Sequence, residues 1–390
     1  MAGELDPSST HPPLPPTTED IRYTHLRLLR SRRVGRTTYH RLLAEYGTAQ
    51  NALAALPEVA QAAGVSGYKT CPEAVVLKEL RDGARIGAKL LIHGHDTYPS
   101  SLMDMTDAPP ALWTLGNTDL LAQPMIAMVG ARNASALGSR MAKSLAQDLG
   151  TQGFVIVSGL ARGIDAAAHL AALPTGTIAV QAGGVDVMYP AENTELAEQI
   201  AQNGLRISEQ PIGLQPQARH FPIRNRIIAG LASGCVVVEA AAKSGSLITA
   251  REAADLGRDV MAVPGHPFDA RASGCNILIR DGATLVRRAE DVVDVIGPLA
   301  APSLNAPQPV QLDLLSPPPP ETTIEKRGEG SDPLTLHTQI LGRLGPTPMP
   351  EDQLLRDLNL NPETFGPALT DLEISGDIHR HAGGFISRPN

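Results

Sequence analysis

Residues 83–297 alternate short apolar runs with segments of helical spacing, and this alternation restricts the fold more than any other feature of the chain. When a helix joins two strands, the second strand lies parallel to the first, and such helices cover both faces of the sheet. Ligands of these α/β domains bind at the carboxyl ends of the strands. The predicted strands are Lys89–His93, Met125–Val129, Phe154–Val157, Thr177–Val180, Leu205–Ser208, Cys235–Glu239 and Asp259–Val263, with helices at Leu137–Leu149, Ile164–Leu173 and Thr194–Asn203 among others.

A small helical module is predicted over residues 21–82, after a Pro- and Thr-rich tail, residues 1–20, that we expect to be disordered. Two helices joined by a turn at Val34 and Gly35 account for the apolar spacing, which resembles that of helix-hairpin-helix and SAM-like units. The segment Ile21–Gln50 holds seven arginines and one acidic residue. The arginines offer a local surface for DNA, but only one glycine lies in the turn, and a solvated arginine face is the alternative.

A second small module is predicted over residues 334–390, after a Pro-rich linker, residues 298–333. Three helical stripes precede two short runs, Ile378–Arg380 and Phe385–Ser387, that flank the pair Gly383-Gly384. This pattern predicts a winged helix. The module holds seven acidic residues against four arginines after residue 336, and Asp371, Glu373 and Asp377 lie at the third helix, where DNA readers need positive charge. This favours a contact with another protein or with the rest of this chain over a contact with duplex DNA.

The segment from Arg219 to Gly265 predicts an anion site. A strand ending at Glu239 is followed by a Ser-Gly-Ser turn and then by helical spacing, so unpaired amides and the positive end of the helix dipole meet at the turn. For Arg224 and Arg226 the alternative is an internal ion pair with Glu209 or Glu239, and for Lys243 it is an ordinary exposed lysine. The residues assigned here are Arg219, Arg224, Asn225, Arg226, Lys243, Ser244, Gly245 and Ser246.

Two further loops that follow predicted strands extend this site. The loop VGARNAS begins at Val129 and offers Gly130 and Arg132 to a phosphate, whereas the bulk of Arg132 argues against the close approach of a dinucleotide pyrophosphate. The segment SGLARGIDAAAH offers Ser158, Gly159 and Arg162. Only 3% of the residues are aromatic, too few for a stacking platform, so phosphate contacts are expected to dominate, with His220 and Phe221 as the rings nearest the arginines.

An enzyme is the alternative from another class. Asp165 and His169 lie four residues apart on one helix face, where a general acid and base are conceivable, but a structural hydrogen bond at a helix start accounts for the same spacing. The chain has no P-loop, HExxH or GxSxG motif. The enzymes that remain are a Rossmann-like nucleotide hydrolase and a phosphoribosyl-transferring enzyme, with Asp165, His169 or Glu239 as candidate groups.

The cysteines and the apolar runs indicate in which compartment the protein functions and whether it binds a metal. Three cysteines without CxxC spacing indicate reduced thiols and neither a disulfide scaffold nor a metal site. The start of the chain lacks the basic and apolar parts of a signal peptide, and no apolar run reaches the roughly 18 residues of a membrane span. We therefore expect a cytoplasmic protein without membrane contact, metal or cofactor.

The motifs VGARNAS, VSGLARGIDAAAH, TIAVQAGGVDVMYP, ISEQP, HFPIRNRIIAGL, VVVEAAAKSGSLITA, VMAVPG and GCNILIRDGA occur in this order. The chain thereby resembles the DNA-processing protein A family, also called DprA or Smf, over residues 83–297, and the two flanking modules match the layout of many relatives. The resemblance implies an extended Rossmann domain that binds single-stranded DNA, dimerises and loads the RecA recombinase during natural transformation, without catalysis. A single-strand binding protein is a further candidate partner.

The resemblance also assigns roles to individual residues. The phosphate loop of the family falls on Gly130 and Arg132, and its basic approach to the FPxRNR motif falls on Arg219. Two positions depart from the family pattern: Ala131 stands where a hydroxyl residue is frequent, and Arg219 where a lysine is frequent. With the first departure a hydroxyl contact to phosphate is lost or moved to another residue, and the second preserves the charge and adds a planar donor pair.

Overall fold

The computed structural model describes residues 17–95, 97–297, 333–344, 349–351, 354–355, 362–381 and 385–388. The chain forms two compact units that divide between residues 304 and 305, and each is described by itself. Residues 1–16 of the disordered tail expected over residues 1–20 lie outside the described residues, but residues 18–20 form the first turn of helix α1 (Thr18–Arg30), so the tail is shorter than predicted. Residues 298–332 of the linker expected over residues 298–333 also lie outside the described residues, and Pro333 is the first residue of helix α12 (Pro333–Arg343). Within the described ranges no helix is both long and apolar enough to cross a membrane.

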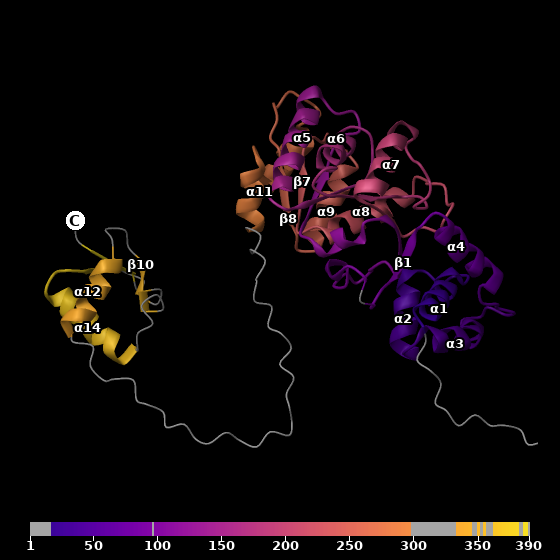
Figure 1. Ribbon diagram of the computed structural model, residues 1–390, viewed down its shortest axis with the longest axis horizontal. Coiled ribbons are helices and arrows are strands. Elements are labelled where there is room, and N and C mark those ends of the chain that lie inside the picture. The colour runs from indigo at the N-terminus through magenta and orange to yellow at the C-terminus, as the bar shows by residue number, and fades with distance from the viewer. Residues whose placement is uncertain are drawn as a thin grey trace, which may run out of the picture. The chain divides into compact units, whose positions relative to one another are not determined.

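A nine-stranded sheet in the order β1-β2-β6-β5-β4-β3-β7-β8-β9 forms the centre of the first unit (Figure 1). Pairing is parallel from β6 to β9, and β1 and β2 form an antiparallel edge. The α/β prediction is confirmed, with this edge as an addition. The strands are β1 (Lys89–Ile92), β2 (Ala111–Gly116), β3 (Met125–Val129), β4 (Val155–Ser158), β5 (Thr177–Val180), β6 (Leu205–Ser208), β7 (Gly234–Val237), β8 (Asp259–Ala262) and β9 (Thr284–Leu285).

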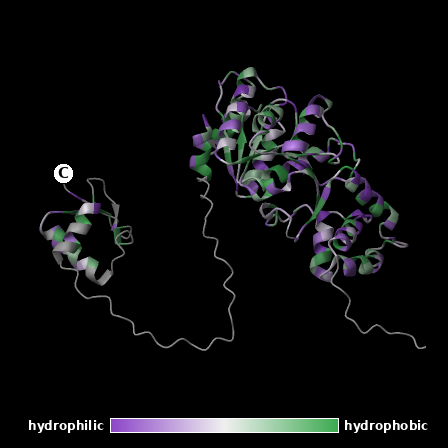
Figure 2. Ribbon diagram, viewed as in Figure 1, coloured by the Kyte–Doolittle hydropathy of each residue, from purple (hydrophilic) through white to green (hydrophobic). Residues whose placement is uncertain are grey.

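Helices cover both faces of the sheet, because the side chains of each buried strand alternate between two apolar layers. Along β3, Ile126 and Met128 pack in one layer with α5, α6 and α11, whereas Ala127 and Val129 pack in the other layer with α8, α9 and α10. Figure 2 shows hydrophobic residues concentrated on the central strands. The helices are α5 (Ala136–Thr151), α6 (Ile164–Ala172), α7 (Thr194–Asn203), α8 (His220–Leu231), α9 (Ser246–Asp255), α10 (Ser273–Arg280) and α11 (Ala289–Ile296).

The N-terminal helical module packs directly on the antiparallel edge of the sheet. Leu26 and Val76 share an apolar cluster with Trp113 of β2. The Trp113 indole donates a hydrogen bond of 2.9 Å to Glu79, which also pairs with Arg30 at 2.8 Å. The module and the sheet therefore form one unit. Its helices are α1 (Thr18–Arg30), α2 (Arg36–Tyr46), α3 (Ala49–Ala62) and α4 (Glu73–Arg85), so α4 runs through the predicted boundary between residues 82 and 83.

The second unit contains α12 (Pro333–Arg343), α14 (Pro362–Ile374) and a three-stranded sheet in the order β10-β12-β11. The strands β11 (His379–His381) and β12 (Phe385–Ser387) pair as the predicted wing, and β10 (Met349–Pro350) adds a short third strand. The apolar cluster of this unit includes Ile340, Phe365, Leu369 and Ile386. Much of the middle helix predicted at Glu351–Leu358, and the glycine pair at 383–384, lie outside the described residues.

Candidate nucleic-acid interface

A cavity of about 910 Å³ lies beyond the carboxyl ends of β3, β4 and β7, where the fold is expected to bind ligands. A second cavity of about 350 Å³ adjoins it and shares Arg132, Tyr189 and Phe221 as lining residues. The predicted residues in the larger cavity are Gly130, Arg132, Phe221, Arg224, Asn225, Lys243, Ser244, Gly245 and Ser246, and those in the smaller one are Arg132, Gly159, Arg162 and Phe221. Ser158, Arg219, His220 and Arg226 line neither cavity.

Arg132 is an exposed cation between the two cavities. Its guanidinium carbon lies 5.3 Å from the centroid of the Phe221 ring, within the range of a cation–π contact. No ion pair of Arg132 is present in the described part of the chain. Its charge is therefore available to an anion, because no carboxylate neutralises it.

Arg224 is buried between the loop after β4 and the end of β5. Its Nη1 atom donates hydrogen bonds to the carbonyl oxygens of Gly159 and Val180, at 2.5 and 2.6 Å. A methyl group on residue 159 would lie 2.1 Å from this nitrogen, so the contact requires glycine. Burial lowers the pKa of the guanidinium to about 10, and the carboxylate of Asp165 opposes this decrease. Arg224 thus fixes two strand ends while it lines the larger cavity.

Arg226 points to the other side of α8, as expected for residues two apart in a helix. Its Nη2 atom lies 2.6 Å from the Glu209 carboxylate, and its Nη1 atom donates to the carbonyl oxygen of Asp107 at 2.8 Å. Only 4% of the residue is exposed. The structure thus gives Arg226 the internal ion pair that was the alternative to ligand contact.

Three other predicted residues also stand apart from the cavities. Ser158 is buried and donates to the carbonyl oxygen of Met128 at 2.6 Å. His220 is buried at the start of α8, where its Nδ1 atom accepts a hydrogen bond of 3.2 Å from the Gln217 amide. Arg219 is exposed beside His220, with 3.4 Å between its Nε atom and the imidazole. Ser158 and His220 therefore support the site, and Arg219 is a nearby surface charge.

The Ser-Gly-Ser turn opens the N-terminus of α9 toward the larger cavity. The hydroxyl oxygens of Ser244 and Ser246 lie 2.7 Å apart, and the Ser244 amide donates to the carbonyl oxygen of Ala241 at 2.9 Å. These bonds hold the turn in place. Lys243 precedes it as an exposed cation, so a full positive charge and the positive end of the helix dipole line one cavity.

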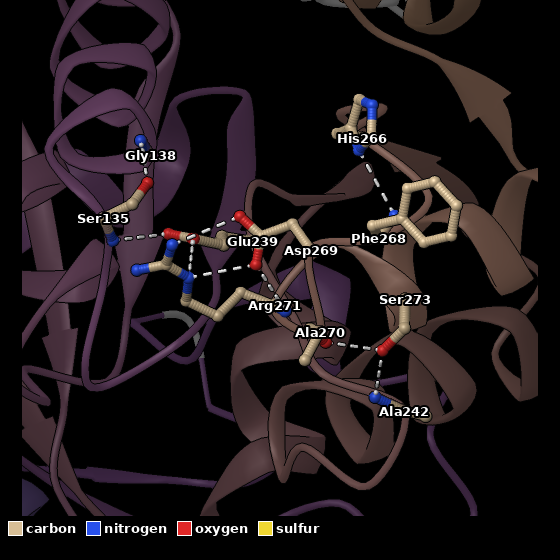
Figure 3. Close-up of polar contacts among 10 residues, drawn as sticks. All are labelled: Ser135, Gly138, Glu239, Ala242, His266, Phe268, Asp269, Ala270, Arg271 and Ser273. Atoms are coloured by element: carbon tan, nitrogen blue, oxygen red, sulfur yellow. Dashed lines mark hydrogen bonds and ion pairs between the residues drawn. The ribbon is translucent and has the colours of Figure 1, made fainter.

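Glu239 fixes the loop that carries Arg132 (Figure 3). Its carboxylate accepts the amide of Ser135 at 2.9 Å and lies 3.4 Å from Nε of Arg271. A methyl group on Gly138 would lie 2.1 Å from the same carboxylate. Arg271 is a lining cation that the sequence did not indicate, because it follows β8 at a distance and pairs with Asp269 in its own loop.

Asp165 and His169 make structural hydrogen bonds, which were the alternative to a general acid and base. The Asp165 carboxylate accepts the amides of Gly159 and Ala161, at 3.1 and 3.3 Å. The Nε2 atom of His169 accepts the Leu160 amide at 3.3 Å, and its Nδ1 atom lies 2.7 Å from the Thr177 hydroxyl. Burial is the main cause that lowers the pKa of His169 to about 3, and the positive charge of Arg224 contributes to the decrease. Both side chains thus fix the loop after β4.

The neutral His169 predicts a dependence of stability on pH. Below about pH 6.5 the imidazole gains a proton in the unfolded chain but not in the folded one, so the free energy of unfolding falls as pH decreases. We expect His169 to contribute a fall of about 1.4 kcal/mol per pH unit between pH 6 and 5. Urea unfolding followed by the fluorescence of Trp113, the single tryptophan, measures it in the first unit.

The matched variants are His169→Asn and His266→Ala. His169→Asn is expected to be less stable at pH 7 and to lose stability more slowly on acidification. His266 is exposed in the loop after β8, so His266→Ala is expected to keep the slope of the parent. Equal slopes in His169→Asn and the parent would contradict the assignment.

Three family models match separate parts of the chain between residues 19 and 384. The family model described as DNA recombination-mediator protein A matches residues 89–297, more than half of the sequence. The chain belongs to this family. Two further models match, the DprA-like N-terminal HHH domain at residues 19–81 and the DprA winged helix domain at residues 316–384. The match confirms the resemblance and the three-part architecture inferred from the motifs.

Relatives and solved structures agree with this assignment. DNA processing protein DprA of Streptococcus pneumoniae is 48% identical over 200 residues, which cover 51% of this chain and 71% of the relative. Protein Smf of Synechocystis is 36% identical over 310 residues, covering 73% and 76%. The S. pneumoniae crystal structure aligns with a TM-score of 0.56 at 37% identity, over 67% of this chain and 98% of that one.

A second solved structure connects the fold with a ligand. DNA processing protein A of Helicobacter pylori, described for its single-stranded DNA binding mode, aligns with a TM-score of 0.51 at 29% identity. The alignment covers 55% of this chain and 97% of that one. The family is thus one of DNA-processing proteins, and a solved relative binds single-stranded DNA.

Proposed function

We propose that this protein binds single-stranded DNA without sequence preference and loads RecA on it, as a homodimer in the cytoplasm. The observation that carries the DNA-binding proposal is the shared cavity of Arg132, Lys243 and the N-terminus of α9. An unpaired guanidinium, an ammonium group and the end of a helix dipole all favour the same ligand, a phosphate. RecA loading, dimerisation and a single-strand binding protein as partner are supported by family membership alone.

The balance of charges in the larger cavity favours a backbone of phosphates. Its lining cations are Arg132, Lys243, Arg224 and Arg271, and its lining carboxylate, Asp165, is occupied by two backbone amides. Contacts to phosphate carry no sequence information. Binding is therefore expected to accept any base sequence and to weaken as salt increases.

The absence of catalysis is also a proposal, supported by the contacts of the candidate catalytic groups. Asp165 and His169 are both buried, and each accepts hydrogen bonds from backbone amides. Glu239 is held between the Ser135 amide and Arg271. A general base must present a free lone pair to the substrate, whereas each of these groups makes hydrogen bonds or an ion pair that hold the surrounding loops. Turnover of a nucleoside triphosphate or a phosphoribosyl donor would favour the enzyme alternative instead.

A salt titration tests the role of Lys243. Replacing it by alanine is expected to lower the affinity for a labelled oligothymidylate about threefold to fivefold. The slope of log affinity against log salt is expected to fall by about 0.7, because one phosphate contact is lost. Fluorescence anisotropy at several salt concentrations measures both quantities.

Lys89→Ala provides a control, because Lys89 is an exposed lysine of β1 that lines neither cavity. This variant is expected to keep the affinity and slope of the parent. Equal slopes for the parent and Lys243→Ala would place Lys243 outside the DNA path.

A further inference from the structure

The smaller cavity meets the larger one at Arg132, and aromatic rings form part of its wall. Tyr189 and Phe221 supply two aromatic rings to it, with centroids 5.7 Å apart and planes inclined by 55°. Tyr189 is 47% exposed although it carries a large ring. In a chain so poor in aromatic residues, two rings at the edge of an anion site offer stacking surfaces where the strand would pass.

The inner wall of the cavity offers hydrogen-bond donors that the protein does not use. Ala182 and Gly183 line the cavity, and neither of their backbone amides donates a hydrogen bond to an atom of the described residues. Gln181 differs, because its side chain donates to the carbonyl oxygen of Val187 and accepts from Arg206. Buried donors usually have partners, so unused amides in a cavity wall point to a ligand with acceptor atoms.

The volume of the smaller cavity and the residues that line it indicate which class of ligand it can hold. About 350 Å³ lies at the small end of the range for ligand pockets, roughly 300–1,000 Å³. A flat ring system with acceptor atoms at its edge uses both the aromatic walls and the amides, and every nucleobase meets this description. Arg132 lines both cavities. When a phosphate binds its guanidinium, the base of the same nucleotide can therefore reach the smaller cavity.

We propose that the smaller cavity receives one nucleobase of the bound strand, with Tyr189 as the wall on which that base stacks. The proposal rests on the proposed function, because the strand enters through the phosphate contacts at Arg132. Ring stacking and generic edge acceptors are common to all bases, so this subsite preserves binding without sequence preference. It adds a contact that an abasic strand cannot make.

The test compares an oligothymidylate with an abasic oligonucleotide of the same length, each titrated with the parent, Tyr189→Ala and Tyr189→Phe. Tyr189→Ala is expected to bind the oligothymidylate about tenfold more weakly and the abasic strand as the parent does. Tyr189→Phe keeps the ring and is expected to stay within about twofold of the parent on both strands. Unchanged oligothymidylate binding by Tyr189→Ala, or an equal loss on both strands, would overturn the proposal.

A second measurement follows the environment of each base in turn, in the parent and in Tyr189→Ala. One 2-aminopurine is placed at each position of the oligothymidylate in turn. At one position or more, its fluorescence is expected to change when the parent binds. The change at that position is expected to be smaller when Tyr189→Ala binds. No change at any position overturns the base subsite. Thymidine 5′-monophosphate that binds as tightly as the oligothymidylate would also overturn it, because the cavity would then be a mononucleotide site.

The proposed function fails by a different result. If the affinity of the parent for the abasic strand does not depend on salt concentration, the phosphate site itself is contradicted, and the results of the Tyr189 variants do not alter that conclusion.

Discussion

Replacing Arg132 by alanine is expected to lower the affinity for an oligothymidylate about 30-fold, or ~2 kcal/mol, the size of one hydrogen-bonded charge contact. Arg132 is exposed and has no carboxylate partner within the described chain, so the substitution breaks no ion pair and, besides the phosphate contact, removes the cation–π contact with Phe221. The slope of log affinity against log salt is expected to fall by about 0.7. Anisotropy titrations at several salt concentrations measure both changes.

Arg140→Ala is the matched control for this experiment. Arg140 is an exposed arginine of α5 that lines neither cavity, and its removal changes the net charge of the protein by the same amount. It is expected to bind within about twofold of the parent. Equal losses in the two variants would mean that the general field of the protein, and not the cavity, holds the strand.

Replacing Arg226 by alanine is expected to destabilise the first unit by about 3–5 kcal/mol at pH 7. The Glu209 side chain is only 11% exposed and would keep a buried charge without the partner that lies 2.6 Å away. The more distant Arg36, at 3.8 Å, replaces that contact in part only. Urea unfolding followed by Trp113 fluorescence reports on this unit. A loss below about 1 kcal/mol would contradict a structural role for the ion pair.

The pH dependence of this loss follows from the Glu209 carboxyl. Burial raises its pKa, and the charge of Arg226 opposes that increase, so the pKa rises further when Arg226 is removed. A carboxyl whose pKa is raised by folding costs stability above that pKa and loses the cost as pH falls through it. The difference between Arg226→Ala and the parent is thus expected to shrink as pH decreases from 7 to 5. A difference that is constant with pH would contradict Glu209 as the source.

The double variant Arg226→Met/Glu209→Gln separates charge from shape. It removes both charges and retains most of the volume of the two side chains, and it is expected to recover most of the stability that Arg226→Ala loses. A double variant as unstable as Arg226→Ala would show that packing, and not the unpaired carboxylate, causes the loss.

The strands that the sequence predicted are those with continuous apolar runs, such as Met125–Val129 and Thr177–Val180, which are buried on both faces in the structure. The strands β2 and β9 were missed for different reasons. β2 follows a Pro-Pro pair and joins an antiparallel edge, so no preceding helix marks it. β9 has two residues, both exposed, and gives no apolar signal.

The candidate site was predictable where the signal is local in the sequence. Arg132 lies in the loop after β3 and the Ser-Gly-Ser turn lies in the loop after β7, and parallel strands bring their carboxyl ends together. The roles of Arg224 and Arg226 were not separable, because the answer depends on Glu209, Gly159 and Val180, which come from other strands and loops. Tyr189 was missed as a site residue for the same reason, since only the folded chain places it beside Phe221.

A crystal structure of the protein with a short oligothymidylate would show directly whether the cavity holds the strand. We expect one phosphate within hydrogen-bonding distance of the Arg132 guanidinium and another at the turn formed by Ser244, Gly245 and Ser246. A strand bound to the arginines of the N-terminal helical module, with no phosphate at Arg132 or at the turn, would contradict the proposed interface.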